Sequence, residues 1–220
     1  MQATDAERGR NESQMDAADR ARGARRAITT WLGAHADRVF PVIAAVLLVA
    51  SIFLPYWHLK LHAPQYPRGL EARITVRTFE GDVREINGLN HYIGMRPLDE
   101  GGEIERSLSI FAIPAMAALA GAMMIRRRWF WLLAVPAILY PVVFTADLFY
   151  WLHNFGHNLD PTAALSASIG EFTPAILGEG KVGQFRTTAF YDVGFGLAAL
   201  ASVLLIVAVV VRLRRERAAG

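Results

Sequence analysis

Four long apolar stretches divide this chain and predict its architecture. They cover Val39–Trp57, Leu108–Ile125, Trp129–Trp151 and Val193–Val211, and Asp147 is the only charged residue inside them. A hydrocarbon core about 30 Å thick needs about 20 apolar helical residues, and backbone groups in lipid must be hydrogen-bonded within their own segment. We therefore predict an all-α membrane protein with four transmembrane helices.

Basic residues flank the four stretches on one side. Arginines crowd the N-terminal segment, the short turn between the second and third stretches, and the C-terminal tail. The positive-inside rule makes that side cytoplasmic, so we expect a multi-pass protein of the bacterial inner membrane with both termini in the cytoplasm. The expected order is an Arg-rich, partly disordered cytoplasmic tail (1–38), a first span (39–57), a periplasmic cap (58–107), a second span (108–125), a cytoplasmic turn (126–128), a third span (129–151), a periplasmic loop (152–192), a fourth span (193–211) and a cytoplasmic tail (212–220).

The cap has the alternating pattern of a half-buried strand. Apolar and polar residues alternate over Leu70–Val76, and a turn at 80–82 followed by Val83–Ile86 predicts a return strand. An isolated hairpin is marginal in water, so this small extracytoplasmic cap containing a β-hairpin should pack on the helix ends or on a partner. In the periplasmic loop we expect turns, a short helix near Thr162–Ile169, and Asp192 as the cap of the fourth helix.

Charge and cysteine content exclude several classes of function. The net charge of +3 is largely explained by the topology signals, so we expect no binding of nucleic acid. With no cysteine there is no disulfide and no thiolate metal site. A transition metal would have to use histidine, methionine, carboxylate or amide groups, which suits an oxidising compartment. No phosphate-binding glycine loop, Ser-His-Asp order or HExxH motif is present, and we predict that the protein is not an enzyme.

Histidines provide the best functional clue, because five of the six fall in the two periplasmic segments. Three pairs have i,i+4 spacing, which on a helix puts both side chains on one face and can hold a metal. For the first pair this requires the helix to continue past Pro55. Histidine and methionine without cysteine form the ligand set expected for copper in an oxidising compartment, and imidazole ligation should weaken below about pH 6. The candidate metal ligands are His58, His62, His91, Met95, His153 and His157.

Asp147 lies less than two helical turns before His153. A carboxylate near ligand histidines often fixes their tautomer, so we expect Asp147 to support the last pair. Simpler interpretations stay open. The histidines can be interfacial residues, Met95 can be a packing residue, and Asp147 can bond a neighbouring helix.

Several strings in the chain also carry a resemblance. They are Ala63–Leu70, which contains APQYP, Gly81–Asn87, Leu89–Met95, which reads LNHYIGM, and Ile176–Phe185. Together they resemble a family of small, largely uncharacterised bacterial membrane proteins that accompany nitrous oxide reductase maturation and copper-handling systems. The resemblance covers about residues 39–211 and implies a copper or respiratory context. It adds Gln65 and Tyr92, which lie in the shared motifs with His62, His91 and Met95, to the candidate site.

The expected function is that of an accessory protein in the lipid bilayer. It would bind copper at the periplasmic surface and deliver it to, or assemble, a periplasmic or membrane-bound respiratory metalloenzyme. One alternative is a non-catalytic scaffold or subunit of a respiratory complex that docks a partner through the cap. Another is a redox subunit whose paired histidines ligate haem or contact quinone, although histidines at the edge of the spans count against it.

Overall fold

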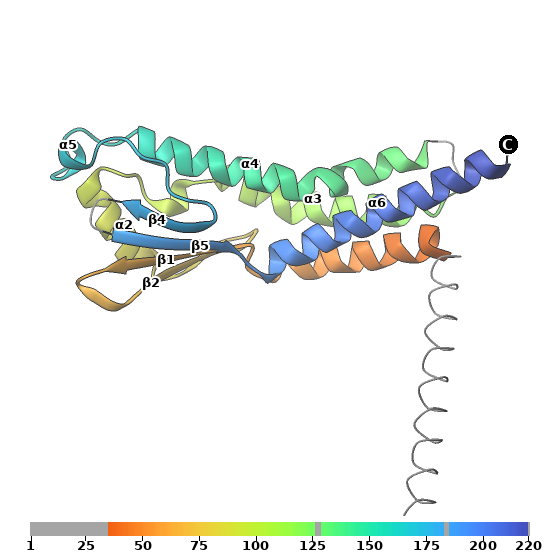
Figure 1. Ribbon diagram of the computed structural model, residues 1–220, viewed down its shortest axis with the longest axis horizontal. Coiled ribbons are helices and arrows are strands. Elements are labelled where there is room, and N and C mark those ends of the chain that lie inside the picture. Colours follow the sequence, from red (N-terminus) through yellow and green to blue (C-terminus); the bar gives the residue numbers. More distant parts are fainter. Residues whose placement is uncertain (1–34, 126–128, 183–184, 220) are drawn as a thin grey trace, which may run out of the picture.

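The computed structural model describes residues 35–125, 129–182 and 185–219 and consists of a helical bundle that carries a β-sheet unit at one end (Figure 1). The first helix covers residues 35–51. The other long helices are α3 (Glu103–Ala122), α4 (Val135–His157), which follows the 3₁₀ helix η2 (Phe130–Ala134), and α6 (Val193–Ala219). The predicted tail up to residue 34 and the predicted turn at 126–128 lie outside the described residues.

Three helices among the described residues are long and apolar enough to cross a membrane. They are Glu103–Ala122, Phe130–His157 and Val193–Ala218. These helices indicate a membrane-embedded protein, as the apolar stretches predict. Helix α4 continues as regular helix past the predicted end of its span at Trp151, so His153 and His157 both belong to it.

The first helix ends earlier than predicted. Its regular part stops at residue 51, and i,i+3 hydrogen bonds from Ile52, Phe53 and Leu54 tighten the chain before Pro55. Proline has no N–H and clashes with the preceding helical turn, so the helix cannot run through this point unperturbed. The predicted end of the first span at Trp57 is therefore wrong, and the condition that the His58/His62 pair required, a helix that continues past Pro55, is not met, because Trp57 begins a strand.

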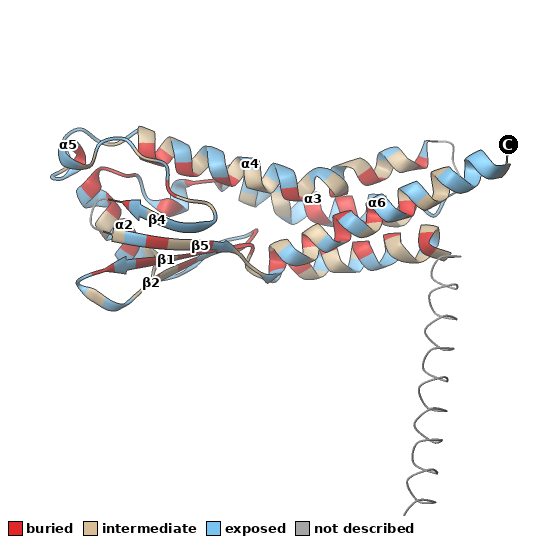
Figure 2. Cartoon of the chain, viewed as in Figure 1, coloured by how far each residue is buried: buried red, intermediate tan, exposed pale blue. Residues whose placement is uncertain are grey.

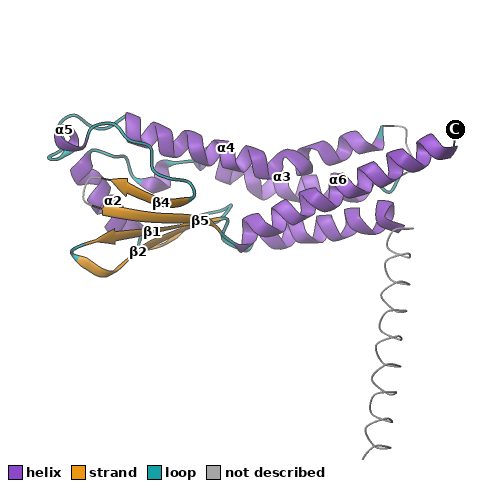
Figure 3. Ribbon diagram, in the orientation of Figure 1, coloured by secondary structure: helices purple, strands orange, loops and turns teal. Residues whose placement is uncertain are grey.

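Five strands form one antiparallel sheet in the order β3-β2-β1-β5-β4 (Figure 3). They are β1 (Trp57–Ala63), β2 (Tyr66–Ile74), β3 (Phe79–Gly81), β4 (Gly178–Val182) and β5 (Phe185–Tyr191). The central strand β1 pairs with its hairpin neighbour β2 and with β5 from the far end of the chain. The unit is thus larger than the predicted hairpin, because strands from both predicted periplasmic segments join it.

The predicted return strand at Val83–Ile86 is wrong, because these residues begin helix α2 (Val83–Ile93). Its buried residues, Ile86, Asn90 and Ile93, follow helical spacing. A run of four residues is too short to distinguish the two-residue period of a strand from the 3.6-residue period of a helix. The helix ends at Gly94, whose φ of 80° lies in the left-handed region. The remaining short helices are η1 (Leu98–Glu100) and α5 (Ser166–Ile169), the latter within the predicted helix near 162–169.

The two faces of the sheet have different surroundings. One face carries Leu59, Leu61 and Ala72, which pack in one apolar core with side chains of α2 and the end of α4 (Figure 2). Side chains on a strand alternate between faces, so the opposite face carries the intervening residues. These residues include His58 and Lys60 on β1 and their register partners on β2 and β5, Arg73, Glu71, Phe190 and Thr188.

The bundle has a second apolar core that is rich in alanine. Ala44 and Leu48 of the first helix pack in one buried cluster with Ala117, Ala198 and Leu205 of α3 and α6. Small residues allow helix backbones to approach closely, as in membrane bundles. The first helix is therefore packed as an integral member of the bundle.

Backbone hydrogen bonds join the sheet to the bundle. Tyr56 donates to Ile74, Asp192 donates to Tyr56, and Gly194 donates to Pro55. The Asp192 carboxylate also accepts a 2.7 Å hydrogen bond from the Val193 N–H at the start of α6, as predicted for the cap of this helix. The sheet is thus held directly on the helix ends.

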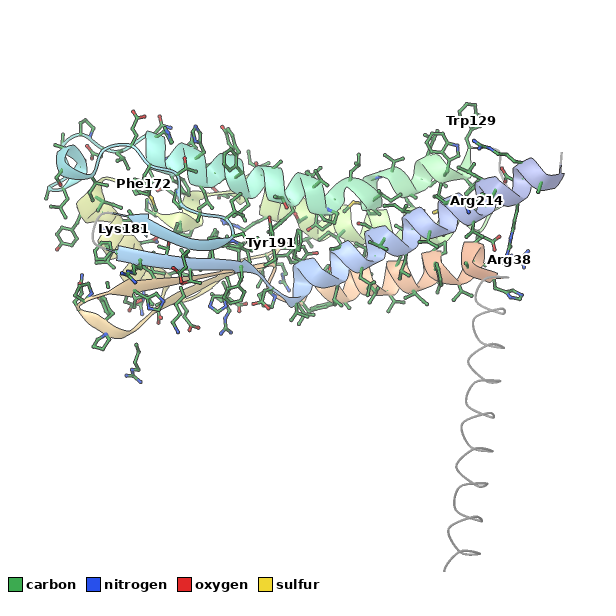
Figure 4. The ribbon with its side chains drawn as sticks, viewed as in Figure 1. Arg38, Trp129, Phe172, Lys181, Tyr191 and Arg214 are labelled. Carbon is green, nitrogen blue, oxygen red and sulfur yellow. The ribbon has the colours of Figure 1, made fainter. Side chains whose placement is uncertain are left out.

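Basic residues occupy the end of the bundle that lies away from the sheet. Figure 4 shows Arg38 and Arg214 there, whereas Lys181 lies at the opposite end of the molecule, on strand β4 of the sheet. Arg212 anchors this end, since it donates a 2.6 Å hydrogen bond to the Met123 carbonyl. Its guanidinium also lies 3.3 Å from the centre of the Phe130 ring. It therefore connects α6 to the end of α3 and to η2.

Replacing Arg212 with alanine should destabilise the bundle. The change removes a charged hydrogen bond to a helix-end carbonyl and a cation–π contact, so we expect a loss of about 1–3 kcal/mol. Lysine should restore only part of this loss, because it lacks the planar guanidinium. The measurement is thermal unfolding in detergent, with Arg214→Ala, an exposed site on the same helix, as the control. Equal midpoints for the two alanine variants would contradict the prediction.

Candidate functional site

The sheet keeps the candidate histidines apart. His58 and His62 alternate with Leu59 and Leu61 on β1, so they project from the face that points away from α2 and α4. Four residues along a strand also span about 13 Å, so this pair does not share one metal ion as it would on a helix. Within the described residues, no three histidine, aspartate or glutamate side chains come together as a metal site. The three pairs therefore do not form a shared centre.

His91 and Met95 are separated by the end of α2. The helix ends at Ile93, and the left-handed Gly94 turns the chain, so the two side chains do not lie on one helical face. His91 is exposed, whereas Met95 is 8% exposed and belongs to the core between sheet and helices. The thioether is thus a packing group in this structure. Of the two motif residues implied by the resemblance, Tyr92 is exposed on α2, and Gln65 is exposed in the turn between β1 and β2.

His58 lies in a group of charged side chains at the base of the sheet. Its Nε2 is 3.5 Å from the Glu71 carboxylate, and its Nδ1 is 3.9 Å from the Asp192 carboxylate. The ring packs on Phe190 with 4.6 Å between centroids, and the residue is 9% exposed. Glu71 is on β2, and Asp192 caps α6. The group therefore connects the sheet to the start of α6, and its contacts indicate a structural role.

Glu71 should make the stability of this junction depend on pH. A hydrogen bond from Lys60 is the main cause that lowers the pKa of Glu71, and the charges of Lys60, His58 and Arg73 add to it. A carboxylate with a lowered pKa stabilises the fold above its ordinary pKa, and this contribution is lost as pH falls through the lowered value. The thermal midpoint of the native protein should exceed that of Glu71→Gln at neutral pH and converge with it as pH falls below the lowered pKa of Glu71. Glu80→Gln, at an exposed position on β3, is the control. If the thermal midpoints of the native protein and of Glu71→Gln still differed at low pH, the Glu71 carboxylate would not be the source of the difference.

His153 and His157 form the one predicted imidazole pair that the structure brings together. Both belong to α4, and their ring centroids are 3.8 Å apart. Nδ1 of His157 lies 2.9 Å from the carbonyl oxygen of His153. A carbonyl only accepts hydrogen bonds, so this Nδ1 carries the hydrogen and Nε2 keeps a lone pair for a ligand. Nδ1 of His153 lies 3.1 Å from the Thr173 hydroxyl oxygen, which can orient that ring in the same way.

A glutamate completes the surroundings of this pair. Nε2 of His157 and a carboxylate oxygen of Glu171 are 4.0 Å apart, and Glu171 is largely exposed. Metal–ligand bonds to nitrogen and oxygen are about 2 Å long, so two ligands of one ion lie up to about 4 Å apart. The two imidazoles can therefore bind a divalent transition metal as a two-ligand site at a solvent-accessible position, with Glu171 nearby but not part of a three-residue metal cluster.

Gly156 explains why Glu171 and Thr173 reach the histidines. The Phe172 N–H donates a 3.1 Å hydrogen bond to the Gly156 carbonyl, and a Cβ at Gly156 would overlap the Phe172 carbonyl oxygen. The absence of a side chain thus lets the segment around Phe172 lie directly on α4. The spacing of the histidines predicts the pair, but nothing in the local pattern marks Thr173, which is 20 residues further along the chain.

Asp147 does not contact the ring nitrogens of His153 and His157 in the way predicted. It interacts with the Trp151 indole and with the charge of Glu105. The groups that contact the Nδ1 atoms of His153 and His157 are Thr173 and a backbone carbonyl. Asp147 therefore belongs to the junction of α3 and α4 with the sheet.

No protein-family model and no curated protein matches this chain.

Proposed function

We propose that this chain is a non-catalytic accessory protein of the bacterial inner membrane that binds copper at its periplasmic surface. It would deliver this cargo to, or help assemble, a respiratory metalloenzyme, in keeping with the resemblance to copper-associated membrane proteins. The observation that carries the proposal is the adjacent pair of His153 and His157, with His157 held in a tautomer that leaves Nε2 available. His153 and His157 are the ligands, Glu171 is the nearby carboxylate, and Thr173 orients a ring.

The proposed topology has four spans, with the sheet unit as a periplasmic cap. It is supported by the packing of the first helix against α3 and α6 in the bundle core. Arg38 and Arg214 lie at the end of the bundle away from the sheet (Figure 4), where the positive-inside rule puts cytoplasmic residues. The site at the end of α4 would then face the periplasm.

The donor atoms indicate which copper ion the site prefers. Two imidazole nitrogens with a carboxylate nearby favour the divalent ion, whereas a soft thioether would favour Cu(I). Met95 is buried in the apolar core and supplies no sulfur to the pair. An exposed pair leaves coordination positions for solvent or for a receiving protein, which suits transfer of the ion.

The test is the copper content of the full chain, purified in detergent and loaded with Cu(II). We expect about one ion per chain, lost in the His153→Ala/His157→Ala variant and kept in the His91→Ala/Met95→Ala variant, which is the matched control. Binding should weaken below about pH 6, because ligand imidazoles must be neutral. Copper that survives loss of the α4 pair would refute this site, and preferential retention of zinc under competition would refute copper as the cargo.

A scaffold function is the second candidate, favoured by exposed apolar side chains on the sheet unit. Tyr92 is 60% exposed and Leu165 is 45% exposed. The Leu165 N–H donates to the Tyr92 carbonyl, so the two residues lie at one place. Exposed apolar surface of this kind suits a protein contact. If this surface docks the metalloenzyme, the metalloenzyme should no longer co-purify with the Tyr92→Ser/Leu165→Ser variant. It should still co-purify with the His153→Ala/His157→Ala variant.

A further inference from the structure

A cavity of about 190 Å³ lies where α3 and α4 meet the sheet. In Figure 1 these two helices run side by side up to the sheet unit. Six aromatic side chains line the cavity: Trp57, Phe79, Tyr140, Phe144, Trp151 and Phe155. An apolar cavity of about 150 Å³ can bind benzene. This one therefore has room for a substituted six-membered ring, in walls suited to stacking on it.

Polar groups in the lining can recognise hydroxyl groups on such a ring. Glu105 and Asp147 contribute carboxylate acceptors. The Trp151 indole N–H is buried and interacts with Asp147 without the geometry of a full hydrogen bond. A hydroxyl group could donate to a carboxylate and accept from this indole, satisfying both sides at once.

The charges in the cavity disfavour an anionic head group. Arg106 also lines the cavity, but its guanidinium donates to the carbonyls of Gly101 and Asp99 and lies 4.7 Å from the Phe79 ring centre. Its hydrogen-bonding capacity is thus already used in part. The guanidinium keeps its single positive charge, but the lining carries two carboxylates against it, and this excess of acidic groups disfavours a lipid phosphate or a fatty-acid carboxylate, so a neutral head fits better.

The cavity reaches the outer surface of the bundle. Val143, which lines it, is 59% exposed and belongs to a helix long and apolar enough to cross a membrane. An apolar tail attached to the ring can therefore leave past Val143 into lipid. Among the described residues, the lining of the cavity contains no histidine, so the cavity is a separate site from the His153/His157 pair.

From these observations we propose that the cavity binds the ring of a membrane-dissolved quinol, with its isoprenoid tail in the bilayer. Asp147 and Glu105 accept hydrogen bonds from the ring hydroxyls, and Trp151 donates to one of them. This ligand site goes beyond the proposed copper function and does not depend on it.

The first test is titration of the detergent-purified full chain with decylubiquinol kept reduced under anaerobic conditions. Trp57 and Trp151 line the cavity, so binding should quench tryptophan fluorescence in a saturable way. We expect at least tenfold weaker binding to Val143→Phe, which narrows the mouth, and to Ser109→Phe, which fills the cavity from α3. Val142→Phe is the matched control, because Val142 is 66% exposed and lies outside the lining. Unsaturable quenching, or equal affinity in all variants, would overturn the proposal.

A second test needs no variant and so does not depend on folding. The dimethyl ether of decylubiquinol keeps the ring and tail but has no hydroxyl donor, and it should bind at least tenfold more weakly than the quinol. Equal affinity would overturn the assigned role of the carboxylates. Phosphatidylglycerol should not displace the quinol at equal concentration, and displacement would identify the cavity as a phospholipid site instead.

Discussion

Alanine at Gly156 should remove most copper binding without touching a ligand. The new Cβ would overlap the Phe172 carbonyl oxygen, so the segment carrying Glu171 and Thr173 must move off α4. Forcing extra volume into a packed contact costs about 1–3 kcal/mol. Loss of groups that orient metal ligands typically lowers affinity by about 10–100-fold. The measurements are thermal unfolding and a Cu(II) titration of the same purified protein.

Gly121→Ala is the control for this prediction. Gly121 lies within α3, and a Cβ there would meet no atom within 4 Å. Alanine favours a helix over glycine by roughly 0.5–1 kcal/mol, so stability should be equal or higher and copper binding unchanged. If Gly156→Ala bound copper as tightly as Gly121→Ala, the close approach at Gly156 would have no part in building the site.

Alanine at Trp57 should cause the largest loss of stability. This side chain is 2% exposed in the core under the sheet. Its indole N–H donates a 2.7 Å hydrogen bond to the Ile176 carbonyl, which precedes β4. Removing a buried tryptophan costs about 3–5 kcal/mol, and here it also leaves a carbonyl without its partner. Trp57→Phe should fall between the native protein and the alanine variant.

Trp129→Ala tests whether the loss depends on burial. Trp129 is 63% exposed at the far end of the bundle (Figure 4), so its replacement should change the free energy of unfolding by no more than about 0.5 kcal/mol. Thermal unfolding in one detergent compares both variants. Similar losses at Trp57 and Trp129 would show that the core between β1 and α4 is not the main source of stability in the sheet unit.

Features that depend on neighbouring residues could be predicted from the sequence. Apolar stretches of sufficient length become helices, because the hydrogen bonds of a helix lie within the segment. The alternation from Leu70 to Ile74 becomes part of β2, and Asp192 begins α6. The helical spacing of His153 and His157 likewise predicts their adjacent rings, since both lie on one regular helix.

Features that depend on distant residues could not be predicted. His58 and His62 have the same spacing as the α4 pair, but β1 pairs with β5 more than a hundred residues away, and the strand separates them. Four residues at Val83–Ile86 fit a strand or a helix, and packing under the sheet selects the helix. Met95 is predicted to be a soft metal ligand because it carries a thioether, but it is buried in the core after the turn at Gly94.

Three of the four predicted spans are therefore confirmed as helices long and apolar enough to cross a membrane, and His153 and His157 as neighbours, because hydrophobic length and i,i+4 spacing act within one helix. Contacts between distant segments determine that the apolar end of the first stretch becomes a central strand and that His58 and His62 occupy the sheet face away from α2 and α4. They also determine that Glu171 and Thr173 reach α4 through the bare backbone at Gly156. These outcomes rest on contacts between distant segments, whose energies are not encoded in any one local pattern.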